Sequence, residues 1–216
     1  MEHKSRPMER IEQNAGVLGI LIAILVSFGG LAEIVPLFVR AHTVAPPAGV
    51  KPYDALRLAG RDIYVRESCY QCHSQMIRSL RFETQRYGAP SDASESVYDR
   101  PFQWGSKRTG PDLARIGGKY SDAWQRLHLT SPRTLVPESN MPNYPWLAKA
   151  EIDEPDLQAR MRTLRTLGDP YTDADILNVP LVVRGKTELD ALVAYLQGLG
   201  VRNVADASGA AQAAAP

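Results

Sequence analysis

The sequence predicts a mainly α-helical domain carried on a single N-terminal transmembrane helix. One long apolar segment lies near the N-terminus, and several later segments space their apolar residues as a helix does. No segment alternates apolar and polar residues as a half-buried strand would. The chain has 216 residues, of which 16 are Gly and 16 are Pro, so we expect one domain with long loops and extensions.

Charge and cysteine content exclude two classes of protein. The chain carries 25 basic and 24 acidic side chains, a formal net charge of +1, which gives no global electrostatic basis for binding nucleic acid. We therefore expect no nucleic-acid partner. Two cysteines in a chain of this length cannot form a disulfide scaffold.

Residues 15–39 are the expected transmembrane anchor. These 25 residues contain a single ionisable side chain, Glu33. As a helix they would be about 37 Å long, against about 30 Å for the hydrocarbon core of a bilayer. A cleaved signal peptide has a shorter apolar region and a small-residue cleavage site, which the sequence after Val39 does not offer clearly. A cleaved signal and a buried core helix are the alternatives.

Glu33 lies six residues from the midpoint of this segment, about 9 Å along a helix. An ionisable side chain at that depth should face protein rather than lipid, unless it reaches the membrane interface. Ala23 and Ser27 offer small side chains for contact with a partner helix. The anchor therefore predicts both membrane lipid and a partner protein as neighbours.

The rest of the chain divides by composition. Pro46, Pro47 and Pro52 indicate a stiff, extended linker after the anchor. The alanine-rich C-terminal segment lacks residues that could form a core. We predict a tail at residues 1–14, the anchor at 15–39, a linker at 40–57, a domain at 58–200 and a disordered tail at 201–216.

Four segments of the domain have helical patterns. They are residues 55–68, residues 121–129 with Ser121 as N-cap, residues 150–168 ended by Gly168, and residues 187–200 ended by Gly198 or Gly200. The last segment places Leu189, Leu192, Val193 and Leu196 on one face. Residues 78–108 form an insertion that is too polar for a core, and we expect it to be a docking surface or a solvated loop.

Both cysteines lie in a C-x-x-C-H motif formed by Cys69, Cys72 and His73. Two thiols three residues apart reach the two vinyl groups on one edge of a haem, and the adjacent histidine then lies under the iron. The motif predicts one covalently bound haem c with His73 as the proximal ligand. Such attachment takes place outside the bacterial inner membrane, so we expect a cytoplasmic N-terminus and a periplasmic domain.

Three other interpretations of the motif remain. A redox dithiol would need a strand–helix unit beside C-x-x-C, and none is visible. A structural zinc site would need a second pair of ligands, whereas His3, His42 and His128 are isolated. A simple disulfide or a chance occurrence is the third.

Four residues could bind the iron on its other side, namely Met76, His128, Met141 and Met161. Met76 is only three residues from His73, and this short tether keeps it on the proximal side. Met161 lies in an amphipathic helix, where methionine usually fills a core. His128 lies on another predicted helix.

Met141 differs because it lies in the proline-rich loop PESNMPNYPW, 68 residues (141 − 73) beyond His73. A fixed, irregular loop can hold a thioether against iron, so we expect Met141 to be the distal ligand. Ligation by His73 and Met141 raises the reduction potential and leaves no open position, which favours an electron carrier.

The TGPDL sequence supplies a candidate support for His73. A metal-binding histidine normally donates its second ring N–H to a carbonyl, and the loop around Pro111 could provide one. An ordinary Gly-Pro turn is the alternative.

These motifs together resemble a known family. A G-x-x-x-Y sequence before C-x-x-C-H, the GPDL loop, the N-M-P loop and the final LDALVAYLQGLG segment resemble a class I cytochrome c domain, whose first helix, here ending at Cys69, crosses its last. The segments GGLAEIVPLF, FQWGSKRTGPDLARIGGKYSDAW and VPESNMPNYPWL narrow the resemblance to the FixO-type monohaem membrane subunit (subunit II) of cbb3-type cytochrome c oxidase.

The resemblance covers residues 10–200 and implies a role for each site residue. It implies that Cys69 and Cys72 bind the haem, that His73 and Met141 ligate the iron, and that the Pro111 carbonyl orients His73. The chain would then be a non-catalytic subunit that relays electrons to a separate haem–copper subunit, in a complex with a dihaem cytochrome c subunit.

Other functions stay open. An independent membrane-tethered electron shuttle would share the haem and the anchor but would need neither the insertion nor an acidic residue in the anchor. The small cytochrome subunit of a nitric oxide reductase is a second alternative, although the WGSKRTGPDL segment speaks against it. A zinc-binding or haem-sensing membrane module is a third. Arg108, Tyr120 and Trp146 are candidates for binding the haem propionates.

Overall fold

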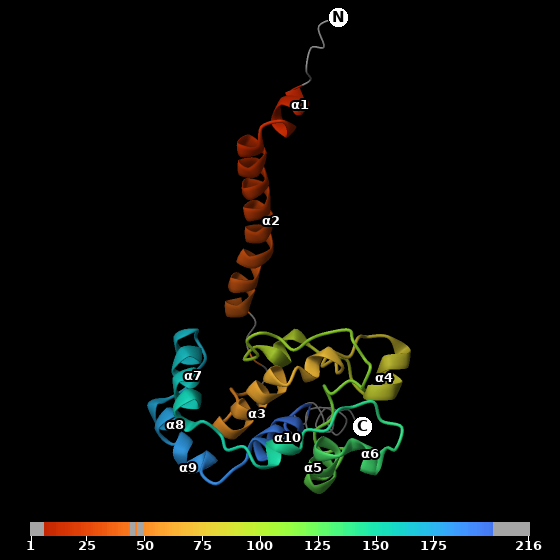
Figure 1. Ribbon diagram of the computed structural model, residues 1–216. Helices are drawn as coiled ribbons and strands as arrows, with labels where there is room; N and C mark the ends of the chain where they lie inside the picture. The colour runs from red at the N-terminus through yellow and green to blue at the C-terminus, as the bar shows by residue number, and fades with distance from the viewer. Residues whose placement is uncertain (1–6, 44–45, 47–49, 201–216) are drawn as a thin grey trace, which may run out of the picture. The chain divides into compact units, whose positions relative to one another are not determined.

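The computed structural model describes residues 7–43, 46 and 50–200 (Figure 1). The chain divides into two compact units, residues 1–45 and residues 46–216. The predicted tail at 1–14 and linker at 40–57 lie partly outside the described residues. The predicted disordered tail at 201–216 lies wholly outside them.

The first unit contains two helices, α1 (Pro7–Glu12) and α2 (Ala15–Thr43). Asn14 begins α2, because its Oδ1 accepts a hydrogen bond from the backbone N–H of Val17 at 3.1 Å. Residues 15–36 of α2 are long and apolar enough to cross a membrane, and α2 continues four residues beyond the predicted end at Val39.

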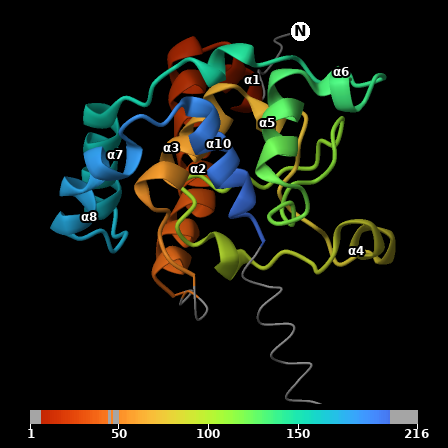
Figure 2. The same cartoon turned by 90° about the horizontal axis from the view of Figure 1, so that it is seen from below.

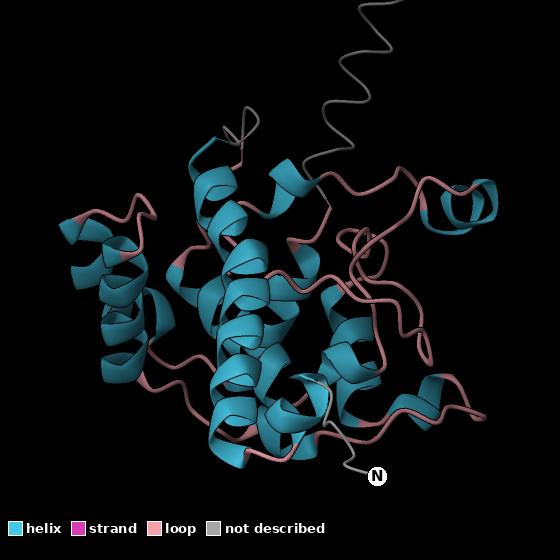
Figure 3. Ribbon diagram, turned by 90° about the horizontal axis from the view of Figure 1, so that it is seen from above, coloured by secondary structure: helices cyan, strands magenta, loops and turns pink. Residues whose placement is uncertain are grey.

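The second unit is built from short helices joined by long loops (Figure 3). Its α-helices are α3 (Ala55–Arg66), α4 (Arg81–Tyr87), α5 (Asp122–Thr130), α6 (Pro132–Leu135), α7 (Glu154–Thr166), α8 (Asp173–Leu177), α9 (Val179–Val183) and α10 (Glu188–Gln197). Three 3₁₀ turns complete it, η1 (Cys69–Gln71), η2 (Ala93–Ser96) and η3 (Pro145–Ala148). The described residues form no strand, which confirms the predicted fold class of a mainly helical chain with one possible membrane helix.

Helices α3 and α10 pack side by side and form the centre of the domain (Figures 1 and 2). Gly60 makes this close approach possible, because a Cβ at that position would lie 2.0 Å from the carbonyl oxygen of Ala191. The face predicted for the last helix is confirmed: its four members are all buried in the core, namely Leu189, Leu192, Val193 and Leu196.

The predicted ends of the later helices agree well with the structure. Ser121 is the N-cap of α5, with its Oγ accepting from the N–H of Trp124 at 3.3 Å. Gly168 follows α7 with a φ of 102°, a conformation that favours glycine, and Gly198 is the C-cap of α10.

The sequence resemblance placed the end of the first helix of the domain at Cys69, but the helix ends earlier. Helix α3 ends at Arg66, and Ser68 adopts a φ of 58° in the left-handed region. This conformation cannot continue a right-handed helix, so the chain turns sharply before η1. The motif therefore begins a separate turn of its own.

The insertion at 78–108 contains buried residues and is therefore more than a solvated loop. Glu83, on α4, is fully buried, and Asp99 and Gln103 are nearly so. Arg61 of α3 donates to Asp99 at 2.6 Å, and Arg100 pairs with Asp169 at 3.0 Å. Asp99 is buried because it forms an ion pair with the rest of the domain. Glu83 is buried because it pairs with Arg78 and Arg108 inside the insertion, and composition alone revealed neither.

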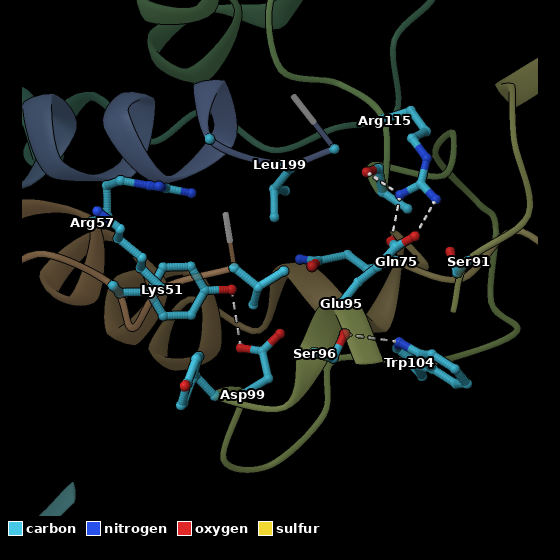
Figure 4. Close-up of a pocket in the computed structure, with 16 residues that line it drawn as sticks. Lys51, Arg57, Gln75, Ser91, Glu95, Ser96, Asp99, Trp104, Arg115 and Leu199 are labelled. Carbon is cyan, nitrogen blue, oxygen red and sulfur yellow. Dashed lines mark hydrogen bonds and ion pairs between the residues drawn. The ribbon is translucent and has the colours of Figure 1, made fainter. Parts of the chain in front are cut away.

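A cavity of about 80 Å³ lies where the insertion meets α3 and the end of α10 (Figure 4). On the insertion side, Arg115 pairs with both carboxylate oxygens of Glu95, and Trp104 donates to the Ser96 hydroxyl at 3.3 Å. Hydrogen bonds and an ion pair thus hold the walls of this cavity together, and the insertion forms a fixed part of the domain surface.

Candidate haem-binding site

The two cysteines lie in a single closed turn. The carbonyl oxygen of Cys69 accepts hydrogen bonds from the N–H groups of Cys72 and His73, at 3.1 and 3.0 Å. Cys69 is partly buried against the core and Cys72 is exposed, and the two thiols are not joined in a disulfide. Burial raises the pKa of the Cys69 thiol to about 12, and the carboxylate of Glu67 adds to this effect. A thiol with so high a pKa is poorly suited to a redox dithiol.

The ring of His73 is held by the loop that contains Pro111. Nδ1 of His73 lies 2.8 Å from the carbonyl oxygen of Pro111. The preceding residue, Gly110, packs directly against the imidazole, because a Cβ there would lie 2.3 Å from Cε1. The N–H of Gly110 also donates to the carbonyl of Cys72 at 2.9 Å, and Tyr64 donates to the carbonyl of His73 at 3.1 Å.

These contacts prepare the imidazole of His73 to bind a metal. A carbonyl can only accept, so Nδ1 carries the proton and Nε2 keeps its lone pair. Burial lowers the pKa of His73, with the hydrogen bond to Pro111 acting in the opposite direction. The ring is therefore neutral at physiological pH, as a metal-binding histidine must be.

The loop that carries Met141 is fixed beside α5 and close to the cysteines. Met141 is partly buried against the core, and its N–H donates to the Ser139 hydroxyl at 3.2 Å. The N–H of Tyr144 donates to the carbonyl of Leu129, at the end of α5, at 2.9 Å. Burial raises the pKa of Tyr144, and the nearby Cys69 raises it further. The loop thus approaches the motif from far along the chain.

The other candidates for the distal position have different surroundings. Met161 is fully buried in the core, as the helical pattern indicated. The backbone of Met76 is bound on both sides, its N–H by Asp112 and its carbonyl by Arg108, so it lies with the Pro111 loop. His128 stacks on Trp124 with ring centroids 4.6 Å apart. Burial lowers the pKa of His128, and His73 lowers it further.

The three candidates for binding the propionates have different surroundings in the structure. Arg108 is committed to protein groups, since its guanidinium donates to Ser74, Met76 and Glu83. We therefore assign it no propionate. Tyr120 stacks on Trp124 at 3.9 Å, and Trp146 is exposed.

Sequence reasoning did not identify Gly110, Ser74 or Asp112 as supports of the site. All three are adjacent to residues that it did identify, and the GPD triplet was the available signal. None of the five predicted site residues lines the cavity of Figure 4. In the described part of the chain, no group of three or more His, Cys, Asp or Glu side chains could hold a metal ion.

The donor set fits a single haem bound through the motif. Two unlinked thiols and a neutral, fixed imidazole occupy one turn, and Gly110 leaves no space between the loop and the ring. A thioether lies in a partly buried loop nearby. Trp124 and His128 of α5 form a stack with Tyr120, which precedes the helix. Aromatic surface of this kind suits a porphyrin.

Comparison with known proteins gives the family. The model of the family described as "Cytochrome C oxidase, mono-heme subunit/FixO" matches residues 8–185, which is most of the chain. No curated protein matches the chain. The matched range includes the anchor, the C-x-x-C-H turn, the Pro111 loop and the Met141 loop. The chain belongs to the FixO family, the mono-haem subunits of cytochrome c oxidase.

Proposed function

We propose that this chain is the membrane-anchored c-type cytochrome subunit of a cbb3-type haem–copper oxidase and relays electrons to the subunit that reduces oxygen to water. The observation that carries the proposal is the C-x-x-C-H turn whose His73 is held by the Pro111 carbonyl. Membership of the FixO family supports it. In this proposal the chain itself does no oxygen chemistry.

Each site residue has a definite task in this function. Cys69 and Cys72 would form thioether bonds to the haem vinyl groups, and His73 and Met141 would bind the iron through Nε2 and Sδ. The Pro111 carbonyl holds the His73 ring at one angle and one tautomer. The haem, when bound, gains and loses one electron. Two protein ligands leave no position for oxygen, so that reaction belongs to a partner subunit.

The same proposal fixes location and partners. Haem attachment to Cys69 and Cys72 requires a periplasmic domain, a cytoplasmic N-terminus and an α2 that spans the inner membrane. The partners are the haem–copper subunit and a dihaem cytochrome c subunit. Glu33, Ala23 and Ser27 are exposed on α2 within the described chain, which leaves their side chains available to a partner helix.

The deciding experiment is purification of the tagged full-length chain in a mild detergent. We expect haem staining of its band after denaturation, and co-elution of haem b, copper and two further subunits with oxygen-reducing activity. A haem-stained chain that elutes alone would identify an independent shuttle. Co-elution with nitric oxide reductase activity would identify the second alternative, and a band without haem stain would overturn the proposal.

A further inference from the structure

A buried ion pair lies directly behind the His73 turn. The guanidinium of Arg108 donates from Nε to the Ser74 hydroxyl at 2.8 Å. Its Nη2 donates to the carbonyl oxygen of Met76 and to Oε2 of Glu83, each at 2.8 Å. Arg108 therefore joins Glu83, on α4 of the insertion, to Ser74 and Met76, the first and third residues after His73.

Ser74 and Asp112 connect Arg108 to the Pro111 loop. The Ser74 hydroxyl donates to Oδ2 of Asp112 at 2.5 Å, and the N–H of Met76 donates to the same oxygen at 3.0 Å. The other carboxylate oxygen of Asp112 accepts from the N–H of Ala114 at 2.8 Å. The network thus connects the residue after His73 with the residue after Pro111.

The contact between His73 and Pro111 lies between two backbone hydrogen bonds of the same two segments. These join Gly110 N–H to Cys72 C=O at 2.9 Å and Leu113 N–H to Ser74 C=O at 2.8 Å. The two segments are therefore hydrogen-bonded to each other on both sides of the His73 ring. The side chains of Arg108 and Asp112 reinforce the second of these connections, at Ser74.

Burial and charge make this network rigid. Glu83 is fully buried and Arg108 is 16% exposed. The hydrogen bond from Arg108 lowers the pKa of Glu83 to about 2, while burial acts in the opposite direction, so the carboxylate is ionised. Arg78 binds Glu83 from the other side, through its backbone N–H and its guanidinium. A fully satisfied buried network holds one arrangement, because every alternative leaves a charge unpaired.

We propose that Arg108, held by Glu83, is a positioning residue that fixes the Pro111 carbonyl against His73 and so sets the reduction potential of the haem. The inference rests on the proposed function and deepens it. A short bond from Nδ1–H to Pro111 makes the imidazole a stronger electron donor, which stabilises oxidised iron. Loosening the carbonyl weakens that donation, and the reduction potential rises.

The test compares two Arg→Lys variants in the assembled, full-length protein. Arg108→Lys keeps the positive charge, but one ammonium group cannot reach Ser74, Met76 and Glu83 together. The matched control is Arg115→Lys, because Arg115 also binds a carboxylate of the insertion with two nitrogens, while its other hydrogen bonds go to the carbonyls of Ala114 and Pro90. Reduction potentials are measured by spectroscopic redox titration, alongside haem staining.

We expect Arg108→Lys to favour the reduced haem by at least about threefold, which is about 28 mV at 59 mV per tenfold. Arg115→Lys should leave the potential unchanged. Ser74→Ala, which removes the same link without a change of charge, should shift the potential in the same direction, and it carries the test if Arg108→Lys does not fold. Unchanged potentials in a normally haem-stained Arg108→Lys and Ser74→Ala would overturn this inference alone. A wild-type band without covalent haem would overturn the proposed function as well.

Discussion

The backbone carbonyl of Ala191 lies against the α-carbon of Gly60, so closely that no side chain fits at position 60. A Cβ on Gly60 would lie 2.0 Å from the oxygen of Ala191 and 2.7 Å from Cβ of Tyr195. The first of these neighbours is backbone, which can move only if the whole helix moves. The packing of the central helices therefore depends on a residue with no side chain.

Gly60→Ala should destabilise the domain even though alanine is the better helix former. Helix propensity favours alanine by roughly 0.5–1 kcal/mol, whereas overpacking of a core usually costs about 1–3 kcal/mol. We expect the clash to dominate, and thermal unfolding of the variant will measure it. Gly105→Ala is the control, because nothing lies within 4 Å of its Cβ position. A Gly60→Ala protein as stable as the wild type would contradict the close contact.

Gly110→Ala should disturb the haem site while leaving the α3–α10 core intact. Its Cβ would lie 2.3 Å from Cε1 of His73, so either the ring or the Pro111 loop must move. Loss of a supporting hydrogen bond to a metal ligand typically costs about 10–100-fold in affinity or activity. The visible spectrum and the reduction potential report the change, with Gly105→Ala again as the control. A normal spectrum and potential would show that the ring is not held in this way.

Met141→Ala should remove the thioether–iron charge-transfer band of the oxidised protein and lower the reduction potential, because a thioether ligand stabilises reduced iron. Met76→Ala is the matched control, since Met76 is bound to the Pro111 side by its backbone. His128→Phe tests the second candidate while keeping a ring to stack on Trp124. Loss of the native spectrum in His128→Phe, with Met141→Ala unchanged, would reverse the assignment.

Cys69→Ala should prevent stable covalent attachment of the haem. One thioether bond would be lost, together with the partly buried sulfur that packs against the core. Haem staining after denaturation measures the result, and we expect a loss of most of the signal. Tyr70→Phe is the control, because it changes the exposed residue between the cysteines and leaves both thiols. Normal staining of Cys69→Ala would refute the attachment scheme.

Glu83 should contribute stability that is lost in acid. Its pKa in the folded protein is about 2, below the usual glutamate value of 4.5, chiefly because Arg108 donates a hydrogen bond to it. A lowered pKa stabilises the folded state above about pH 4.5, and that contribution disappears as the pH falls through about 2. The thermal midpoint of the wild type should therefore fall faster with acid than that of Glu83→Gln. Glu151→Gln, which removes an exposed carboxylate, should behave as the wild type, and parallel curves for all three would contradict the prediction.

The sequence predicted those elements whose signals are local. The N-cap at Ser121 and the buried face of α10 depend on residues within a few positions of each other, and both are found in the structure. The membrane helix depends only on length and composition. Family membership depends on several motifs along one chain and is equally open to sequence reasoning.

The structure of the insertion was harder to predict from the sequence, because it depends on partners that are distant along the chain. Glu83 is 25 residues from Arg108, and Asp99 is 38 residues from Arg61. No periodic pattern marks a carboxylate that is buried because an arginine elsewhere pairs with it. The end of α3 was also misplaced, since the left-handed conformation of Ser68 has no signature in a serine.

The pairing of α3 with α10 joins two segments of the chain that are synthesised at different times. Arg66, at the end of α3, binds Glu188, at the start of α10, across 122 residues of sequence. During synthesis the cysteine motif is therefore made before the helix that completes the core around it. The domain around the motif can therefore close only after α10 has been made.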